Sequence, residues 1–218
     1  MDTKLPTHRS TGKNNIIFFG DSISFGEFVN PHLNWVTRLS NKIENQYGSK
    51  YLTINCSING NTTRQALERM PFDVQRYGVD LLCAQFGMND CNYWETDEGL
   101  PRVSPDVYHS NLKEIVYRGY KFGASVVFLP TSHPTPHDTL NKHNLSYEQN
   151  RKQYSEIVRN VAIETNSVLI DVEKYFEATI SENVPLNDLL IPDGIHLSPQ
   201  GHNLYTDIFW PIINQYLD

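Results

Sequence analysis

The sequence predicts an α/β domain built on a mostly parallel, five-stranded sheet with helices on both faces. Short, continuous apolar runs alternate along the chain with longer segments of helical periodicity, which is the pattern of parallel strands joined by helices. The chain has 218 residues, enough for one such domain and few for two. Hydrophobic residues make up 39% of it and charged residues 20%, a globular composition with enough apolar material for a core.

The first half of the chain is expected to alternate three strands with two helices. Residues 15–19 form an apolar run closed by Gly20, as in a strand buried on both faces. A helix is expected at about 32–47, where apolar residues recur on one face and Gly48 provides a stop. The remaining elements of this half are a strand at 51–55, a helix at 63–69 ended by Pro71, and a strand at 79–86.

The second half is expected to hold two more strands and the longest helices. Ser104-Pro105 opens a helix in the preferred order of a capping residue followed by proline, and Gly123 ends it. Ser198-Pro199 opens the last helix in the same way, and that helix runs to about residue 215. Between them we expect a strand at 125–129, a helix at 147–165, a strand at 168–170 and one short helix at 172–180.

The organisation of the chain is expected to be simple, with a flexible N-terminal segment at 1–14 and a single domain at 15–218. Residues 1–14 are polar and lack the apolar core of a secretory signal, and no stretch approaches the roughly 20 apolar residues of a membrane span. The cysteines, Cys56, Cys83 and Cys91, show no metal-like spacing. We therefore expect a cytoplasmic protein with reduced cysteines.

The balance of charge argues against two classes of partner. The chain has a formal net charge of −7 and a sequence pI of about 5.6. Nucleic acids and anionic membranes are bound through clusters of Lys and Arg, which an acidic surface does not favour. We expect no nucleic acid partner and no membrane insertion, and a small molecule as the ligand.

Four short polar blocks are in positions that suggest a shared site. The blocks are 20–23 (GDSI), 59–62 (NGNT) and 87–90 (GMND), each directly after a predicted strand, and 193–196 (DGIH), just before the last helix. Each block alone is an ordinary turn sequence. Because ligands of open parallel sheets bind beyond the carboxyl ends of the strands, residues in these positions are expected to meet.

In these four blocks the chain resembles the GDSL, or SGNH, hydrolase family, which is named for a Ser, a Gly, an Asn and a His in four separated blocks. The matching residues are Ser22, Gly60, Asn89 and His196, and the resemblance extends over residues 20–196. The first block reads GDSI in place of GDSL, a small apolar change. The resemblance implies a flavodoxin-like, three-layer α/β/α sandwich and a serine ester hydrolase.

The chemistry of ester cleavage explains the need for a serine, a histidine and an acid. A serine hydroxyl is a weak nucleophile until a base accepts its proton, and an imidazole can accept that proton and return it to the leaving alcohol. Ser22 is the candidate nucleophile and His196 the candidate base. Asp193 lies three residues before His196, across a glycine, so one tight loop can bring its carboxylate to the imidazole. The G-x-S-x-G elbow of α/β-hydrolases is absent around Ser22.

The oxyanion that forms when the ester carbonyl is attacked needs hydrogen-bond donors already in place. Three donors are expected: the backbone N–H groups of Ser22 and Gly60, and the side-chain amide of Asn89. Gly60 has no Cβ, so its backbone can approach a substrate closely. The Asn89 amide can donate hydrogen bonds without carrying a charge, which suits a buried site.

Several polar residues near the blocks are interpreted as structural. Asp21 and Asp90 are expected to brace the loops that carry Ser22 and Asn89. His202 is expected to pack inside the molecule from the last helix, and Asp171 to cap a helix after the fifth strand.

A metal site and a cofactor are not expected. The one cluster considered is His133, His137, Asp138 and His143. Its spacing matches no helix face, and two prolines interrupt the segment.

Substrate-binding residues are sought in two long loops, because loops at the rim of a site commonly carry specificity. Tyr93 and Trp94 lie in the loop at 91–104, and His133 in the loop at 131–146. Aromatic and polar groups together suit a polar or carbohydrate-like substrate. We therefore expect hydrolysis of short acyl esters, with acetyl esters favoured.

Two other functions use the same sequence features. A thioesterase or an acyltransferase would need the same catalytic residues. A non-catalytic flavodoxin-like module would bind a nucleotide or flavin instead, and would need a phosphate-cradling loop after the first strand. The loop at 20–28 has two acidic residues and no basic one, which disfavours phosphate.

Overall fold

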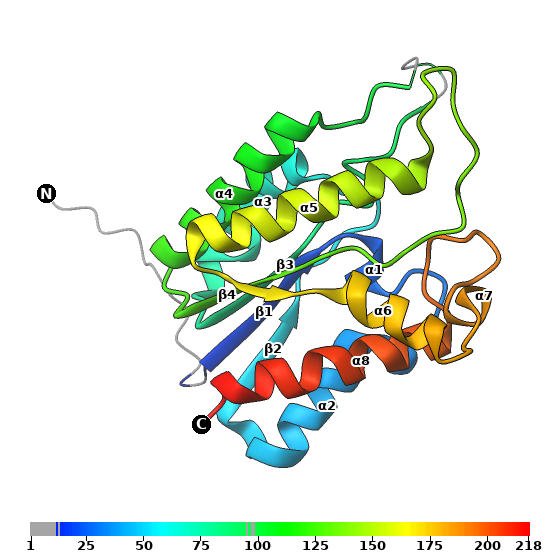
Figure 1. Cartoon of the computed structure of the whole chain (residues 1–218). Coiled ribbons are helices and arrows are strands. Elements are labelled where there is room, and N and C mark those ends of the chain that lie inside the picture. Colours follow the sequence, from blue (N-terminus) through cyan, green and yellow to red (C-terminus); the bar gives the residue numbers. More distant parts are fainter. Residues whose placement is uncertain (1–11, 13, 95, 97–98) are drawn as a thin grey trace, which may run out of the picture.

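A computed structural model of the chain describes Gly12 and residues 14–94, 96 and 99–218 (Figure 1). Of the segment at 1–14, only Gly12 and Asn14 are among the described residues, so the predicted flexible segment lies almost entirely outside them. In the loop at 91–104, residues 95, 97 and 98 also lie outside.

The centre of the molecule is a five-stranded sheet in which every pairing is parallel (Figure 1). The strand order is β2-β1-β3-β4-β5, so the chain winds outward in both directions from β1, as in flavodoxin-like folds. The predicted parallel, flavodoxin-like sheet is thereby confirmed. The strands are β1 (Asn14–Gly20), β2 (Tyr51–Asn55), β3 (Leu81–Gln85), β4 (Val126–Pro130) and β5 (Val168–Ile170).

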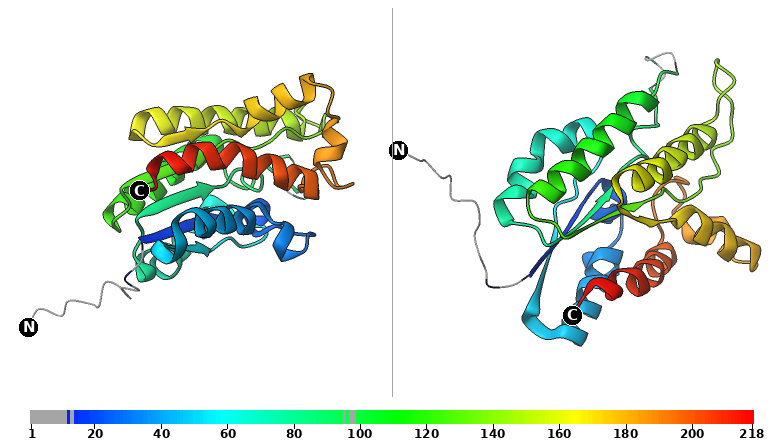
Figure 2. Two further views of the ribbon diagram at one scale, coloured as in Figure 1. Left: turned by 90° about the horizontal axis from the view of Figure 1, so that it is seen from below. Right: turned by 60° about the vertical axis from the view of Figure 1, so that its left-hand side comes forward.

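Helices cover both faces of the sheet and give the three layers expected from the sequence (Figure 2). One face is covered by α3 (Thr63–Asp73), α4 (Pro105–Lys121) and α5 (Tyr147–Thr165), and the other by α2 (Trp35–Tyr47) and α8 (Pro199–Ile213). The shorter helices are α1 (Ser22–Phe25), α6 (Val172–Ser181) and α7 (Leu186–Leu189). No helix among the described residues is long and apolar enough to cross a membrane.

The two-sided core follows from the alternation of side chains along each strand. Successive residues of a strand point to opposite faces, so a run of apolar residues supplies both layers at once. In β1, Ile16 and Phe18 pack with α2 and α8, whereas Ile17 and Phe19 pack with α3 and α4. Continuous apolar runs were therefore reliable predictors of these strands.

The helix α3 continues past the residue that was expected to end it. Pro71 lies inside the helix, which runs to Asp73. Proline removes one backbone donor near the end of the helix, and the next turn still closes because the N–H of Val74 bonds the carbonyl of Met70 at 3.0 Å. Met70 is fully buried, so packing outweighs the lost hydrogen bond. The short helix α7 was not predicted.

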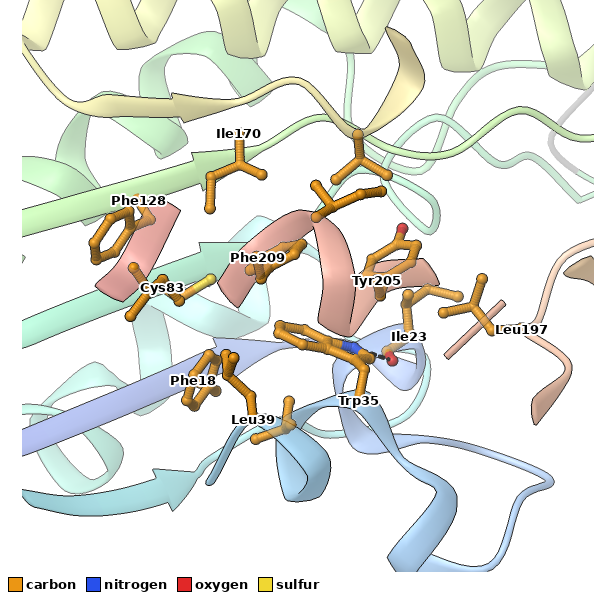
Figure 3. Close-up of a cluster of buried hydrophobic side chains, with 14 of the residues drawn as sticks. Phe18, Ile23, Trp35, Leu39, Cys83, Phe128, Ile170, Leu197, Tyr205 and Phe209 are labelled. Carbon is orange, nitrogen blue, oxygen red and sulfur yellow. Dashed lines mark hydrogen bonds between the residues drawn. The ribbon is translucent and has the colours of Figure 1, made fainter. Parts of the chain in front are cut away.

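Trp35 connects the sheet to the turn that follows β1 (Figure 3). Its indole Nε1 donates a hydrogen bond of 2.9 Å to the carbonyl of Ile23, next to Ser22. The ring is fully buried, with its centroid 5.4 Å from that of Phe18 and 4.4 Å from that of Phe209. The first turn after β1 is thus anchored to both α2 and α8.

Replacing Trp35 should destabilise the protein through two effects. Trp35→Phe removes the donor to Ile23 and leaves unfilled space, so we expect the free energy of unfolding to fall by about 2–3 kcal/mol. Urea denaturation followed by circular dichroism measures this. Tyr117→Phe, at a residue 62% exposed on α4, is the control and should change stability by less than about 0.5 kcal/mol. Equal stability of wild type and Trp35→Phe would contradict the anchoring role.

Candidate active site

The four polar blocks meet where β1 gives way to α1, at the carboxyl ends of the strands (Figure 1). At this point the direction in which successive strands are added to the sheet reverses, because β1 pairs with β2 on one side and with β3 on the other. Open α/β sheets bind ligands at such a switch point. Gly20 makes the turn possible, because a Cβ there would lie only 2.8 Å from the carbonyl oxygen of Gln85.

A chain of hydrogen bonds joins Ser22, His196 and Asp193. The Oγ of Ser22 is 2.9 Å from the Nε2 of His196, and the Nδ1 of His196 is 2.6 Å from Oδ2 of Asp193. An ionised carboxylate only accepts hydrogen bonds, so the proton on a neutral His196 lies on Nδ1. The lone pair of Nε2 then faces the hydroxyl of Ser22. This is the tautomer that a general base requires.

The loop at 193–196 is closed by its own aspartate. Oδ1 of Asp193 accepts hydrogen bonds of 2.9 Å from the backbone N–H groups of Ile195 and His196. Partial burial by itself would raise the pKa of Asp193. The hydrogen bonds from the ring and backbone of His196 outweigh that effect and hold the pKa of Asp193 below its usual range. The carboxylate therefore stays ionised beside the imidazole.

His133 contacts the loop at 193–196 from the interior of the protein. The sequence had instead suggested that His133 contacts the substrate. It is fully buried, its Nδ1 is 2.7 Å from the hydroxyl of Tyr205, and its Nε2 is 2.8 Å from the carbonyl oxygen of Ile195. Burial lowers the pKa of His133 to about 3, so the ring is neutral and donates from Nε2. A ring buried in this way is out of reach of substrate. We therefore correct the substrate-binding assignment of His133 to one of support.

Arg102 connects the loop that carries Gly60 to the loop that carries Asn89, the residues expected to supply two of the three oxyanion donors. Its guanidinium donates to Oδ1 of Asn89 at 3.2 Å and to the carbonyl oxygen of Gly60 at 3.1 Å. A guanidinium cannot accept hydrogen bonds, so the amide oxygen of Asn89 must face Arg102. The Nδ2 of Asn89 consequently lies on the side of Asp21, at 3.5 Å from its Oδ2, next to Ser22. Gly60 has a φ of 74°, a conformation that favours glycine.

Two buried carboxylates hold these loops in place, as expected for Asp21 and Asp90. Oδ1 of Asp21 accepts from the N–H of Ile23 at 3.0 Å and caps α1. Oδ1 of Asp90 accepts from the N–H of Thr63 at 2.9 Å and so ties the loop after β3 to the start of α3. Burial raises the pKa of Asp21 to about 7 and that of Asp90 to about 6.

Tyr93 and Trp94 have different surroundings. Tyr93 lines a cavity of about 560 Å³ that His137, Tyr147 and Ile195 also line, beside the loop at 193–196. Trp94 is 57% exposed, and the guanidinium of Arg102 lies 5.8 Å from the centre of its ring. Tyr93 thus faces a cavity, whereas Trp94 lies against Arg102.

The remaining sequence candidates have structural surroundings. His202 is buried, with its Nδ1 accepting from the backbone N–H of Trp35 at 3.3 Å. Asp171 precedes α6 but makes no capping bond, and instead pairs with Arg159 at 2.6 Å. Among the residues that the structure describes, no group of three or more His, Cys, Asp or Glu side chains could hold a metal ion.

Sequence reasoning missed two neighbours of the site. Glu27 lies with its Oε2 3.2 Å from the Nε2 of His196, and Phe28 packs edge-on against the same ring. Arg102 lies in the loop at 91–104, where the sequence analysis singled out only Tyr93 and Trp94. Its contacts with Gly60 and Asn89 depend on which strands are neighbours in the sheet, and strand order cannot be predicted from a local sequence motif.

The fold and the residues gathered at its switch point define a class of ester hydrolases, the three-layer SGNH type. A model of the GDSL-like lipase/acylhydrolase family matches residues 18–204, and the chain belongs to that family. It is therefore a carboxylic ester hydrolase, as the sequence predicted.

Similar proteins of known name agree with this assignment. The chain is 25% identical over 211 residues to an acetylxylan esterase of Geobacillus stearothermophilus, covering 89% of this chain and 91% of that protein. It is 29% identical over 120 residues to an arylesterase of Vibrio mimicus, covering 55% of this chain and 56% of that protein. A crystal structure of a Geobacillus stearothermophilus acetylxylan esterase superposes with a TM-score of 0.73 at 21% identity, covering 91% of this chain and 93% of that one.

Neutralising Asp21 should stabilise the protein at alkaline pH. The ordinary pKa of an aspartate is about 3.9, so its rise to about 7 in the folded state makes the folded protein hold a proton that the unfolded chain releases. Stability from this group is present below about pH 4 and is lost as the pH rises through 7. Asp21→Asn keeps the Oδ1 acceptor and carries no charge. We expect it to be more stable than wild type by about 2–4 kcal/mol at pH 8, and similar at pH 4.

Urea denaturation at the two pH values tests this expectation. The matched control is Asp188→Asn at an exposed position, which should change stability by less than about 0.5 kcal/mol at either pH. A stability difference for Asp21→Asn that is the same at pH 4 and pH 8 would show that folding does not raise the pKa of Asp21.

Proposed function

We propose that this enzyme hydrolyses short acyl esters, acetyl esters above all, of a polar or carbohydrate-like alcohol through a Ser22-His196-Asp193 triad. The observation that carries the proposal is the unbroken chain of hydrogen bonds from Ser22 Oγ through the imidazole to Asp193, at 2.9 and 2.6 Å. Arg102 supports it by holding the loops of Gly60 and Asn89 beside Ser22.

The first half of the proposed reaction acylates the serine. Nε2 of His196 takes the hydroxyl proton as Ser22 Oγ attacks the ester carbonyl, and Asp193 stabilises the imidazolium that results. The oxyanion accepts hydrogen bonds from the N–H groups of Ser22 and Gly60 and from Nδ2 of Asn89. Ser22 is the first residue of α1, where backbone N–H groups have no acceptor within the helix and remain available. His196 then gives its proton to the leaving alcohol oxygen, and the acyl group stays on Ser22.

The second half restores the enzyme. A water molecule gives its proton to Nε2 of His196 and attacks the acyl carbonyl. The tetrahedral intermediate collapses with the release of the carboxylic acid, and the proton on His196 returns to Ser22 Oγ. The same donors stabilise the oxyanion in both halves.

The nature of the substrate is inferred from the cavity beside the loop at 193–196. Its lining combines amide and hydroxyl groups with a larger apolar surface that includes Leu140, Ile195 and aromatic rings, a combination that suits a molecule with both hydroxyl groups and a carbon skeleton. The similar protein from Geobacillus stearothermophilus is named an acetylxylan esterase, and this name supports the choice of acetyl esters of a carbohydrate. The cavity lining includes Asn92, Tyr93, His137, Thr139, Asn141 and Tyr147.

A thioesterase is the second candidate. The chain is 26% identical over 116 residues to a thioesterase 1/protease 1/lysophospholipase L1 of Escherichia coli, covering 51% of this chain and 54% of that protein. Acetyl thioesters measured beside the oxygen esters distinguish the two functions. A higher kcat/KM for the thioester would favour the second.

Removing the nucleophile should abolish activity. We expect Ser22→Ala to lower kcat on p-nitrophenyl acetate by at least about 10³-fold, because the covalent step is lost. Ser110→Ala, at an exposed position on α4, is the matched control and should behave as wild type. Initial rates at 405 nm measure both, with p-nitrophenyl octanoate alongside, for which a lower kcat/KM is expected. Equal rates for wild type and Ser22→Ala would end the proposal.

Removing the Asn89 amide should slow the chemistry with little effect on binding. Loss of one oxyanion donor commonly lowers kcat by about 10²–10³-fold. We expect that loss for Asn89→Ala, with KM changed by less than about threefold. Asn89→Asp keeps the acceptor for Arg102 but loses the donor, so it should be no better than the alanine variant. Near-wild-type kcat in Asn89→Asp would exclude Asn89 as an oxyanion donor.

A further inference from the structure

A carboxylate and an exposed aromatic ring flank His196 on the side away from Asp193. Oε2 of Glu27 lies 3.2 Å from Nε2, the same nitrogen that contacts Ser22. The Glu27 side chain is 27% exposed, so it remains open to an incoming molecule. The ring of Phe28 packs edge-on against the imidazole, with the ring centroids 5.1 Å apart.

The backbone fixes Glu27 relative to the serine. Gly26 ends α1 with a φ of 81°, and the N–H groups of Gly26 and Glu27 both donate to the carbonyl of Ser22, at 2.9 and 3.1 Å. The carboxylate is therefore attached to the same short turn as the Oγ of Ser22. The proton of a neutral His196 lies on Nδ1, so Glu27 and Nε2 form an ion pair only when the imidazole is protonated.

Phe28 is held in a conformation that packing does not explain. Its φ is 68°, in the left-handed region that a bulky residue rarely adopts, and its side chain is 69% exposed. An exposed ring gains little from burial to offset such strain. Strain of this kind concentrates at functional sites, where the surrounding structure enforces it. The outlier therefore points to a use for the ring at the surface of the site.

The position of these two residues identifies the part of the substrate they would meet. Nε2 of His196 must deliver its proton to the leaving alcohol oxygen, so this oxygen comes within hydrogen-bond distance of Nε2. Glu27 is already at that distance, and the rest of the alcohol must pass beside it. A carboxylate accepts hydrogen bonds from hydroxyl groups, attracts cations and repels anions. An exposed aromatic face adds an apolar surface for the carbon skeleton.

We propose that Glu27 and Phe28 form an alcohol-side subsite that selects esters of neutral, hydroxyl-bearing or cationic alcohols and rejects esters of anionic alcohols. The inference rests on the proposed function, since it takes His196 as the proton donor to the leaving group. It adds a selection by charge that the triad and the oxyanion donors do not provide.

Three acetates of matched size and different charge test the role of Glu27. They are 2-(trimethylammonio)ethyl acetate, 3,3-dimethylbutyl acetate and 2-acetoxyethanesulfonate, with acetate release followed at constant pH and low salt. Wild type should prefer the cationic over the neutral ester by about tenfold in kcat/KM, and the neutral over the anionic ester by a similar factor. Glu27→Gln should bring all three within about twofold of one another. Glu44→Gln, an exposed change near the end of α2, should keep the wild-type order.

The ratios separate this proposal from other roles of Glu27. If Glu27→Gln changes all three rates by one common factor, Glu27 acts only through His196 and the subsite is disproved. If the wild-type order survives in Glu27→Gln, the charge selection comes from elsewhere and the proposal is also overturned. Activity remaining in Ser22→Ala would instead refute the proposed function, and the two failures are therefore distinguishable.

A second variant tests the aromatic ring. Phe28→Gly removes the ring and suits the positive φ, so the turn should keep its shape. We expect KM for an acetylated methyl xyloside to rise about fivefold relative to KM for ethyl acetate. Equal changes in KM for the two esters would remove Phe28 from the subsite.

Discussion

The pairing of β1 with strands on both sides is the constraint on which the rest of this structure depends. Because the chain winds away from β1 in opposite directions, no helix can cover the carboxyl end of β1, and a crevice remains there. Both faces of the sheet are apolar and covered by helices, and the polar groups of the four blocks gather at this edge. Ser22 directly follows β1, and Asn89 lies in the loop after the neighbouring β3. Their proximity is a consequence of strand order.

Organising this crevice requires polar groups that would otherwise weaken the interior. Asp21 and Asp90 are buried carboxylates with raised pKa values, and His133 is a buried imidazole held neutral. Each is hydrogen-bonded to backbone, and in each case that backbone belongs to α1, to α3 or to the loop at 193–196. Burial thus turns flexible loops into rigid supports for the reactive groups. In the proposed mechanism the donors and the base are thus positioned before the ester binds, which is the basis of electrostatic catalysis.

Much of the fold could be predicted from the sequence because the information lies in local patterns. The residue patterns at 51–55, 147–165 and 168–170 predicted β2, α5 and β5 with their observed bounds. The helix through Pro71 was missed because tertiary burial of Met70 outweighs a local rule.

In the site, the residues of the four blocks were predicted together, and the structure brings them together. His133 was misjudged because a loop sequence does not reveal whether a side chain points out or in. Glu27 was missed because its relation to His196 joins two turns far apart in the chain, which no spacing records.

The guanidinium of Arg102 has a consequence for how such an enzyme can change over time. Arg102 belongs to the loop at 91–104, which also carries Tyr93 at the cavity. Its guanidinium donates hydrogen bonds to Gly60 and Asn89. Under the proposed function, substitutions that reshape this loop to admit a different ester would also shift the groups proposed to stabilise the oxyanion. Substrate choice and turnover rate would then be coupled through Arg102. The turn at Glu27 and Phe28 is joined instead to Ser22 and His196, through the Glu27 N–H on the Ser22 carbonyl and the Phe28 ring on the imidazole. Under the proposed subsite, a change of preference made at this turn would leave the loops of Gly60 and Asn89 in place and would act on the nucleophile and the base instead.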